Sequence, residues 1–260
     1  MAVYNNIVKK INENVDLHVL HLETISGDFK LYLDAHLVEI CNGNSGDEIK
    51  EIKSYLVDYM DSKKDQTLEL GSIAEFFIHL YLKYIGFKQE CMFFNMEEGS
   101  IKKGFDGYYS NSTDQWIMES KSGKSTSKSI EHPSKIKEAF ADLKNKIGGK
   151  SSKPTVKQNN PWRNAYNHAG HRDINSAEDL LKNLKKFSSE FQKGKYHDIK
   201  GFNVIPASTI FFYKDWSLID ENYIETEISK WLKKVNYSKL LIICINNKSK
   251  GLFWSYLQDE

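Results

Sequence analysis

The sequence has few cysteines and no long hydrophobic run. Its three cysteines, Cys41, Cys91 and Cys244, lie far apart and form no C-x-x-C pair. An odd number of isolated cysteines is typical of a protein from a reduced cytoplasm. The chain contains no run of ~18 apolar residues, the length that a transmembrane helix needs, and no basic segment followed by an apolar run at its start. We therefore expect a soluble, cytoplasmic protein that does not enter a membrane.

The chain also has almost no net charge and no phosphate-binding loop for ATP. Its formal net charge is +1, so any affinity for nucleic acid must come from a local patch. The pattern G-x-x-x-x-G-K-[ST] is absent, because Gly123-Lys124-Ser125 lacks the upstream glycine. The chain is therefore not an ATP-driven motor by itself. Its 260 residues, 40% of them hydrophobic, suffice for one large α/β domain or two small ones.

Residues 103–124 carry the most informative pattern. Asp106 lies in a glycine-flanked turn, and a polar loop then leads to a strand that ends in Glu119-Ser120-Lys121. Because alternate residues of a strand share a face, Glu119 and Lys121 project together. If Asp106 lies on the neighbouring strand, one small volume holds two carboxylates and an ammonium group. Such a set can hold Mg²⁺ and position a water for phosphodiester hydrolysis, although Glu-x-Lys is also common on solvated strands.

A polar stripe interrupts the helix predicted over residues 70–85. Gly71, Ser72 and Glu75 are spaced so that they share one face of this otherwise apolar helix. One interpretation is a solvated side with Glu75 as an ordinary surface acid. The other is that the small residues Gly71 and Ser72 let the helix approach the sheet edge. Glu75 then completes the acidic cluster through water or a second metal ion.

The order of these elements resembles a known nuclease superfamily. A helix Glu, a turn Asp and a strand Glu-x-Lys follow one another, as in the PD-(D/E)XK nucleases, although Phe105 replaces the usual Pro. More narrowly, L-x-x-G-S-x-x-E, then G-x-D-G, then E-x-K resembles the HamA family, the nuclease-like subunit of the two-component Hachiman antiphage system. A lysine-rich helix after the E-x-K fits the same comparison. The resemblance covers roughly Glu69–Lys146.

The resemblance implies a Mg²⁺-dependent DNA nuclease, with Mn²⁺ as a substitute metal. Glu75, Asp106, Glu119 and Lys121 are then the catalytic residues. Asp106 and Glu119 ligate the metal, the Ser120 backbone carbonyl is an extra ligand, and Glu75 contributes through water. The resemblance alone also implies a helicase subunit as the partner, which restrains the nuclease until foreign or damaged DNA arrives.

Lysines accumulate directly after the Glu-x-Lys strand. Residues 121–157 contain ten lysines and three acidic residues, a surplus that suits a polyanion beside the predicted site. We expect Lys124, Lys128 and Lys135 to contact DNA, although a solvated lysine-rich helix gives the same pattern. Residues 148–175 are predicted to form a long loop whose aromatic and basic residues stack on bases, dock a partner or simply flex.

The rest of the pattern predicts an α/β protein. We expect a restriction-endonuclease-like core with a central mixed sheet flanked by helices, over 61–260, and an N-terminal β-rich region and helix packed on that core, over 1–60. The predicted strands outside the site are 15–22, 29–40, 87–94, 204–213, 240–246 and 251–257, and the predicted helices 48–60, 176–191 and 223–235.

Two other functions fit the same residues. One is a restriction or repair endonuclease that acts alone and needs its own sequence readout. The other is a non-catalytic scaffold of the same fold that binds DNA or a partner. The intact Asp, Glu and Lys set argues against the scaffold.

Overall fold

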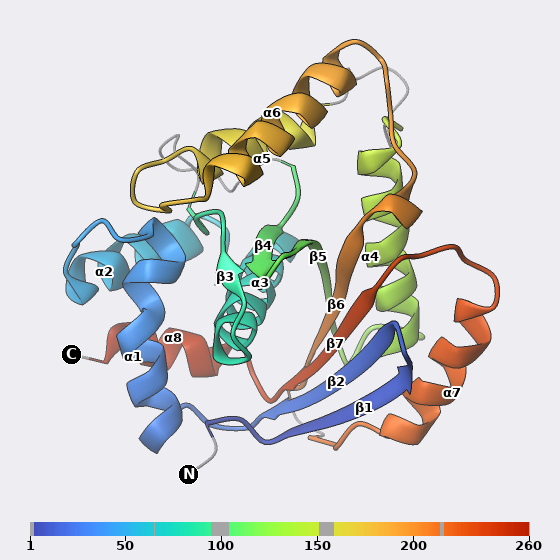
Figure 1. Ribbon diagram of the computed structural model, residues 1–260. Coiled ribbons are helices and arrows are strands. Elements are labelled where there is room, and N and C mark those ends of the chain that lie inside the picture. Colours follow the sequence, from blue (N-terminus) through green and yellow to red (C-terminus); the bar gives the residue numbers. More distant parts are fainter. Residues whose placement is uncertain (1–2, 65, 95–103, 151–158, 214–215, 260) are drawn as a thin grey trace.

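A seven-stranded mixed sheet lies at the centre of the computed structural model, which describes residues 3–64, 66–94, 104–150, 159–213 and 216–259. The strand order is β1-β2-β7-β6-β5-β4-β3 (Figure 1). The central strands β2, β7, β6 and β5 are parallel, whereas β1, β4 and β3 run antiparallel to their neighbours. The strands are β1 Asn6–Asn12, β2 Val15–Leu22, β3 Lys88–Gln89, β4 Gly107–Asn111, β5 Asp114–Lys124, β6 Asn203–Phe211 and β7 Leu240–Asn247.

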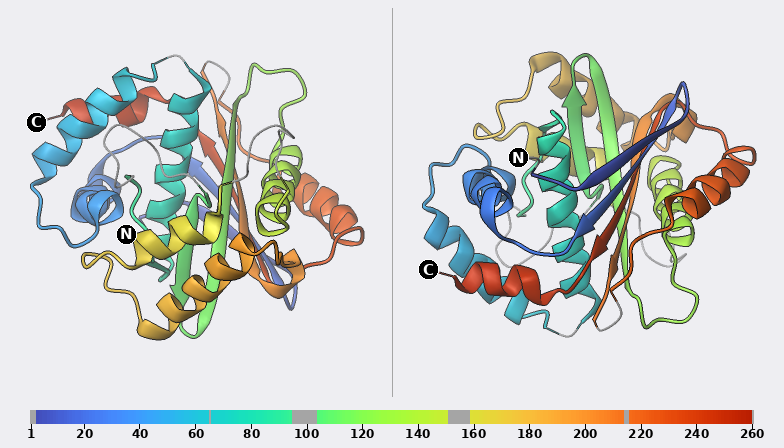
Figure 2. Two further views of the ribbon diagram at one scale, coloured as in Figure 1. Left: turned by 90° about the horizontal axis from the view of Figure 1, so that it is seen from above. Right: turned by 90° about the horizontal axis from the view of Figure 1, so that it is seen from below.

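Helices cover both faces of the sheet (Figure 2). One face packs against α1, α2, α3 and α8, and the other against α4, α5, α6 and α7, so that each face has its own apolar core. The helices are α1 Gly27–Asn42, α2 Ile49–Asp61, α3 Thr67–Tyr84, α4 His132–Ile147, α5 Pro161–Ala169, α6 Glu178–Gln192, α7 Glu221–Leu232 and α8 Gly251–Gln258, with a short 3₁₀ turn at Ile199–Gly201. No helix in these ranges is long and apolar enough to span a bilayer.

The predicted α/β fold is confirmed. The strand expected over 240–246 is β7, and every residue of β7 is buried because helices cover both of its faces. The strands at the N-terminus form a hairpin that continues the same sheet, since β2 pairs in parallel with β7. The division into regions 1–60 and 61–260 stays a prediction.

Two segments predicted as strands are helices. Residues 29–40 belong to α1, whose buried side chains Phe29, Leu33 and Leu37 are spaced by four. Residues 251–257 belong to α8, which buries Phe253 and Tyr256. Residues 29–40 alternate apolar and polar side chains over short stretches, and this alternation is compatible with a helix as well as with a strand. Residues 251–257 form a short, mostly apolar run, which does not distinguish a helix from a strand either.

Two further predictions are wrong in part. The strand expected over 87–94 is reduced to β3, after which the backbone N–H groups of Phe93 and Phe94 donate to carbonyls at the end of α1. The loop expected over 148–175 contains α5, which begins at Pro161 because the side chain of Asn160 accepts from the Arg163 backbone N–H. Residues 151–158 of the predicted long loop, and residues 95–103, lie outside the described residues.

His132 attaches the beginning of α4 to the sheet. It is the first residue of the helix and is buried. Its Nδ1 lies 2.9 Å from Ser208 Oγ of β6, and its Nε2 lies 3.0 Å from Asn246 Oδ1 of β7. Burial lowers the pKa of His132 to about 4, so the ring is neutral in the folded protein at pH 7.

The neutral state of His132 predicts a pH-dependent stability. The unfolded chain binds a proton at His132 near pH 6.5, whereas the folded chain does so only near pH 4. The contribution is therefore fully present above pH 6.5 and is lost as the pH falls toward 4. We expect the free energy of unfolding of the wild type, relative to His132→Gln, to fall by about 3 kcal/mol from pH 7 to pH 4. Urea unfolding of both proteins across this range checks this; a constant difference contradicts it.

Candidate active site

The β4–β5 hairpin brings Asp106 beside the Glu-x-Lys segment. Gly107 of β4 pairs with Met118 of β5, so the residues next to this pair, Asp106 and Glu119, lie across from one another. The Ser120 backbone N–H donates to Asp106 Oδ2 at 2.8 Å. The sequence prediction that Asp106 lies on a neighbouring strand segment therefore agrees with the observed arrangement.

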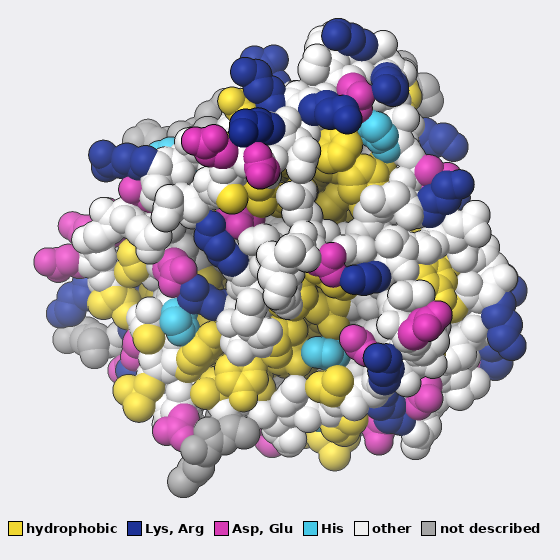
Figure 3. Space-filling model, viewed as in Figure 1, with side chains coloured by type: hydrophobic (Ala, Val, Ile, Leu, Met, Phe, Trp, Pro, Cys, Tyr) yellow, Lys and Arg dark blue, Asp and Glu magenta, His cyan; other side chains and the backbone are white. Residues whose placement is uncertain are grey.

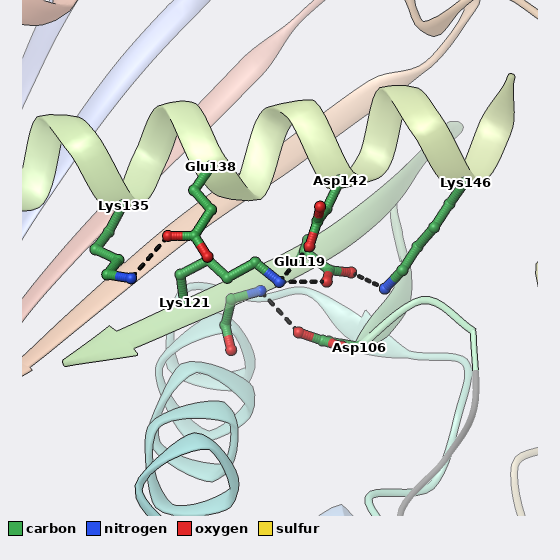
Figure 4. A network of polar contacts seen from close by, with 8 residues as sticks. Asp106, Glu119, Lys121, Lys135, Glu138, Asp142 and Lys146 are labelled. Atoms are coloured by element: carbon green, nitrogen blue, oxygen red, sulfur yellow. Dashed lines mark hydrogen bonds and ion pairs between the residues drawn. The ribbon is translucent and has the colours of Figure 1, made fainter. Parts of the chain in front are cut away.

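Glu119 lies at the centre of a network of charged side chains (Figure 4). Its side chain is only 3% exposed, and its Oε1 lies 3.0 Å from Lys121 Nζ. Its other oxygen, Oε2, accepts from Nζ of Lys146. Lys121 Nζ also lies 2.5 Å from Asp142 Oδ2. Because Asp142 and Lys146 are four residues apart on α4, one face of this helix closes the network from above the sheet.

The electrostatics of the network follow from burial and from the opposing charges. Burial, and after it the Asp106 charge, raise the pKa of Glu119, and the ammonium groups of Lys146 and Lys121 lower it, so that the resulting pKa is about 7. Burial alone lowers the pKa of Lys121, but Glu119, Asp142 and Asp106 outweigh it, so the pKa is raised. The pKa of Lys146 is raised in the same way, chiefly by Glu119. Both lysines are therefore cations at neutral pH.

The donor set suits a hard divalent cation. Asp106 and Glu119 supply carboxylate oxygens, which Mg²⁺ prefers. Their mutual repulsion is visible in the raised pKa of Glu119, and a bound cation would relieve it. Among the described residues no three His, Cys, Asp or Glu side chains form a metal site by themselves. The Ser120 carbonyl and water would have to complete the coordination.

Glu75 lies on the other face of the sheet. It is buried on α3, and its Oε1 lies 3.4 Å from His79 Nε2. The other ring nitrogen of His79 contacts the Tyr109 hydroxyl. Burial raises the pKa of Tyr109, and Glu75 and Asp106 both add to the increase, so both carboxylates lie within electrostatic reach of this ring. The participation of Glu75 in the site stays a prediction.

For Gly71, the expected role in a close approach of α3 to the sheet is wrong, because a Cβ added there would meet no described atom within 4 Å. A close contact does exist at Gly107 of β4, where a Cβ would lie 2.4 Å from Cε2 of Tyr109. Gly107 follows Asp106 directly, and it thus allows the Tyr109 ring to pack beneath the turn that carries the carboxylate.

Replacing Gly107 by Ala should destabilise the protein, whereas the same change at Gly71 should not. The clash with the buried Tyr109 ring is expected to cost about 1–3 kcal/mol of unfolding free energy. Gly71→Ala removes a helix glycine without a clash and should stabilise the fold by about 0.5–1 kcal/mol. Urea unfolding of the two variants checks this prediction, and equal effects contradict it.

The three lysines predicted to contact DNA occupy different environments. Lys124 is exposed at the end of β5, with Nζ 5.8 Å from the centroid of the Tyr213 ring. Lys128 is exposed in the segment before α4. Lys135 on α4 pairs with Glu138 at 2.7 Å, so part of its charge is balanced. Their role in DNA binding stays a prediction, and Lys153 and Lys157 of the basic segment lie outside the described residues.

Sequence reasoning missed Asp142 and Lys146. Both were counted with the charges of the α4 region, yet their side chains reach the buried site. A signal is present: Asp142 and Lys146 flank Leu143, which belongs to the buried stripe of α4. Charged residues four apart beside such a stripe can reach under the helix toward a buried partner.

The fold and the site together define the class of protein to which the chain belongs. An α/β chain with a mixed sheet that presents Asp and Glu-x-Lys on adjacent antiparallel strands has the architecture of the restriction-endonuclease-like proteins. Comparison with protein-family models matches residues 2–258 to the HamA family, and the chain belongs to this family. It is thus associated with Hachiman antiphage defence, a multi-subunit system. A search of curated proteins finds no match.

Proposed function

We propose that this protein is a Mg²⁺-dependent deoxyribonuclease, the cytoplasmic effector subunit of its defence system. The single observation that carries the proposal is the cluster of half-buried Asp106, just before β4, with buried Glu119 and half-buried Lys121 of β5. Two carboxylates and an ammonium group in one small volume are what metal-assisted phosphodiester hydrolysis requires. Membership of the HamA family supports the role in defence.

The residues of the cluster have different proposed roles, which follow from their chemistry. The carboxylates of Asp106 and Glu119 and the Ser120 carbonyl would hold the cation, with Mn²⁺ as a substitute. When bound, the cation supplies an activated water and offsets charge on the phosphate. Lys121, which Asp142 and Glu119 hold in place, would donate to the attacking water or to a phosphate oxygen. Glu75 would take part through water.

A helicase subunit is the proposed partner and would hold the nuclease in check. The chain has no G-x-x-x-x-G-K-[ST] loop, so ATP-driven unwinding must come from another chain. Association with a multi-subunit system supports a partner of this kind.

One observation favours a second function, that of a non-catalytic scaffold. Both oxygens of Glu119 already contact ammonium groups, those of Lys121 and Lys146. If these contacts persist, the site is a closed ion-pair network that stabilises the hairpin and excludes a metal ion. The fold then serves only to bind DNA or a partner.

Cleavage of supercoiled plasmid separates these functions. The chain is incubated with plasmid alone and together with its co-purified partner, each in Mg²⁺, in Mn²⁺ and in EDTA. We expect nicking with either metal and none in EDTA. Cutting at defined sites by the chain alone favours a free endonuclease. A plasmid that is bound but intact under every condition contradicts the proposal and supports the scaffold.

A further inference from the structure

Helices α5 and α6 form a firmly packed pair. Trp162 of α5 is fully buried and packs on Phe187 of α6, with ring centroids 4.7 Å apart. At the beginning of α5, Asn160 Nδ2 donates to the Ser188 backbone carbonyl at 2.8 Å. These contacts hold the two helices side by side (Figure 2). Their outer residues therefore keep a fixed spacing.

A basic groove runs between the outer faces of this pair. It has a volume of about 340 Å³, and Arg163 of α5 lies in its wall with Lys185 of α6 and Lys193 just beyond the end of α6. All three side chains are exposed, and the described residues that line the groove include no acidic one. Figure 3 shows Lys and Arg side chains gathered over the part of the surface where α6 lies. We call this feature the α5–α6 groove.

The positive charge of the α5–α6 groove is not balanced by the acids of the same region. Glu190 pairs with Lys195 at 3.0 Å, Asp179 pairs with Lys182 at 3.3 Å, and Asp173 pairs with Arg172 at 3.3 Å. Within the ranges that the structure describes, no carboxylate pairs with the three cations of the groove. Their charge is therefore available for an anionic ligand.

The groove is connected to the candidate active site through α5. Phe105, the residue before Asp106, packs on Trp162 with ring centroids 5.0 Å apart. A Cβ added at Gly104 would lie 3.3 Å from Asn164 Nδ2. The turn that carries Asp106 thus rests on the first turn of α5, and Arg163 lies in sequence between Trp162 and Asn164, which contact it.

We infer that the α5–α6 groove binds the phosphate backbone of the nucleic acid that the candidate active site cleaves. This inference rests on the proposed function. The neutral residues of the groove include Asn167, Ser189 and Gln192, which can also donate hydrogen bonds to phosphate oxygens. Among the described residues of the wall, Tyr166 is the one aromatic residue. A protein partner needs apolar anchors in the centre of its interface, and this groove does not provide them.

Salt-dependent DNA binding tests the inference without any cleavage step. Binding of a fluorescent single strand and of its duplex is measured by anisotropy in EDTA, at several salt concentrations. The test variant is Arg163→Ala/Lys185→Ala/Lys193→Ala. The control is Lys10→Ala/Lys233→Ala/Lys234→Ala, which removes the same charge from exposed positions on β1 and after α7.

In the test variant, fewer counterions should be released when DNA binds, because the phosphate contacts of the groove are lost. Each lost phosphate contact lowers the slope of log K against log salt by about 0.7–0.9. We therefore expect the slope to fall by about 2–3 in the test variant, and by less than about one in the control. Unfolding in urea should be the same for both variants, because all six positions are exposed.

The outcomes separate the groove from the active site. If the test variant binds DNA with the slope of the control, the inference is wrong, even if the wild type cleaves plasmid. If it binds DNA normally but loses its co-purified partner, the groove docks protein and the inference is also wrong. If the slope falls as expected while the wild type cleaves nothing, the groove assignment stands and the proposed nuclease function fails.

Discussion

Replacing Lys121 by Met is expected to lower the rate of Mg²⁺-dependent plasmid cleavage about 100- to 1000-fold, with DNA binding retained. Lys121 is the one ammonium group of the Glu-x-Lys pair, and Glu119 and Asp142 keep it charged and fix its position. Met fills the space of the lysine stem but cannot donate to the attacking water or to a phosphate oxygen. The change therefore removes the chemistry and keeps most of the packing.

Stability must be measured beside activity for this variant. Removal of one partner from a buried ion pair costs up to about 3–5 kcal/mol, and we expect the lower end because Glu119 keeps its contact with Lys146. Lys144→Met on α4 is the control, since Lys144 is exposed. A folded Lys121→Met protein that cleaves at the wild-type rate shows that Lys121 has no role in the reaction.

Trp162→Ala is expected to lower the free energy of unfolding by about 3–5 kcal/mol, the largest stability change we predict. The Trp162 ring is fully buried between Phe105, Phe187 and Phe202, at centroid distances of 5.0, 4.7 and 5.0 Å. Its loss leaves a cavity where α5, α6 and the turn of Asp106 meet. We therefore also expect weaker cleavage, because Phe105 no longer has a wall to pack against.

Trp162→Phe separates the loss of volume from the loss of the indole N–H. No described residue accepts a hydrogen bond from Trp162 Nε1. The change to Phe therefore removes packing contacts but no hydrogen bond. We expect Trp162→Phe to lower the free energy of unfolding by less than about 2 kcal/mol. Urea unfolding with cleavage assays on both variants checks this. If Trp162→Ala lowers the free energy of unfolding no more than Trp162→Phe does, the packing of Trp162 is not what holds α5 on the hairpin.

Local patterns predicted the hairpin because its geometry is local. The period of two places Glu119 and Lys121 on one face of β5, and a short polar turn brings Asp106 across from them. The same reasoning failed for α1 and α8, because the alternation in α1 and the short apolar run in α8 are compatible with helix and strand alike. In both segments, packing against α2 and the sheet favours the helix, and a single sequence does not record such contacts.

The rest of the site depends on contacts between distant segments. Lys146 reaches Glu119, and Asp142 reaches Lys121, only because His132, Ile136 and Leu143 pack α4 on the sheet. The α5–α6 groove likewise depends on the packing of Trp162 on Phe187. The basic composition of both segments is visible in the sequence, but which lysines enter the site and which remain at the surface is decided by tertiary packing.

Cleavage by Glu119→Gln beside Glu138→Gln tests the central claim most directly. Both variants make the same isosteric change, but Glu119 is buried between Lys121 and Lys146, whereas Glu138 is exposed on α4 and pairs with Lys135. Supercoiled plasmid is incubated with Mg²⁺ and with each protein, together with the co-purified partner. We predict that Glu138→Gln nicks at the wild-type rate and that Glu119→Gln leaves the plasmid intact. Equal nicking by both variants contradicts the metal-dependent nuclease site.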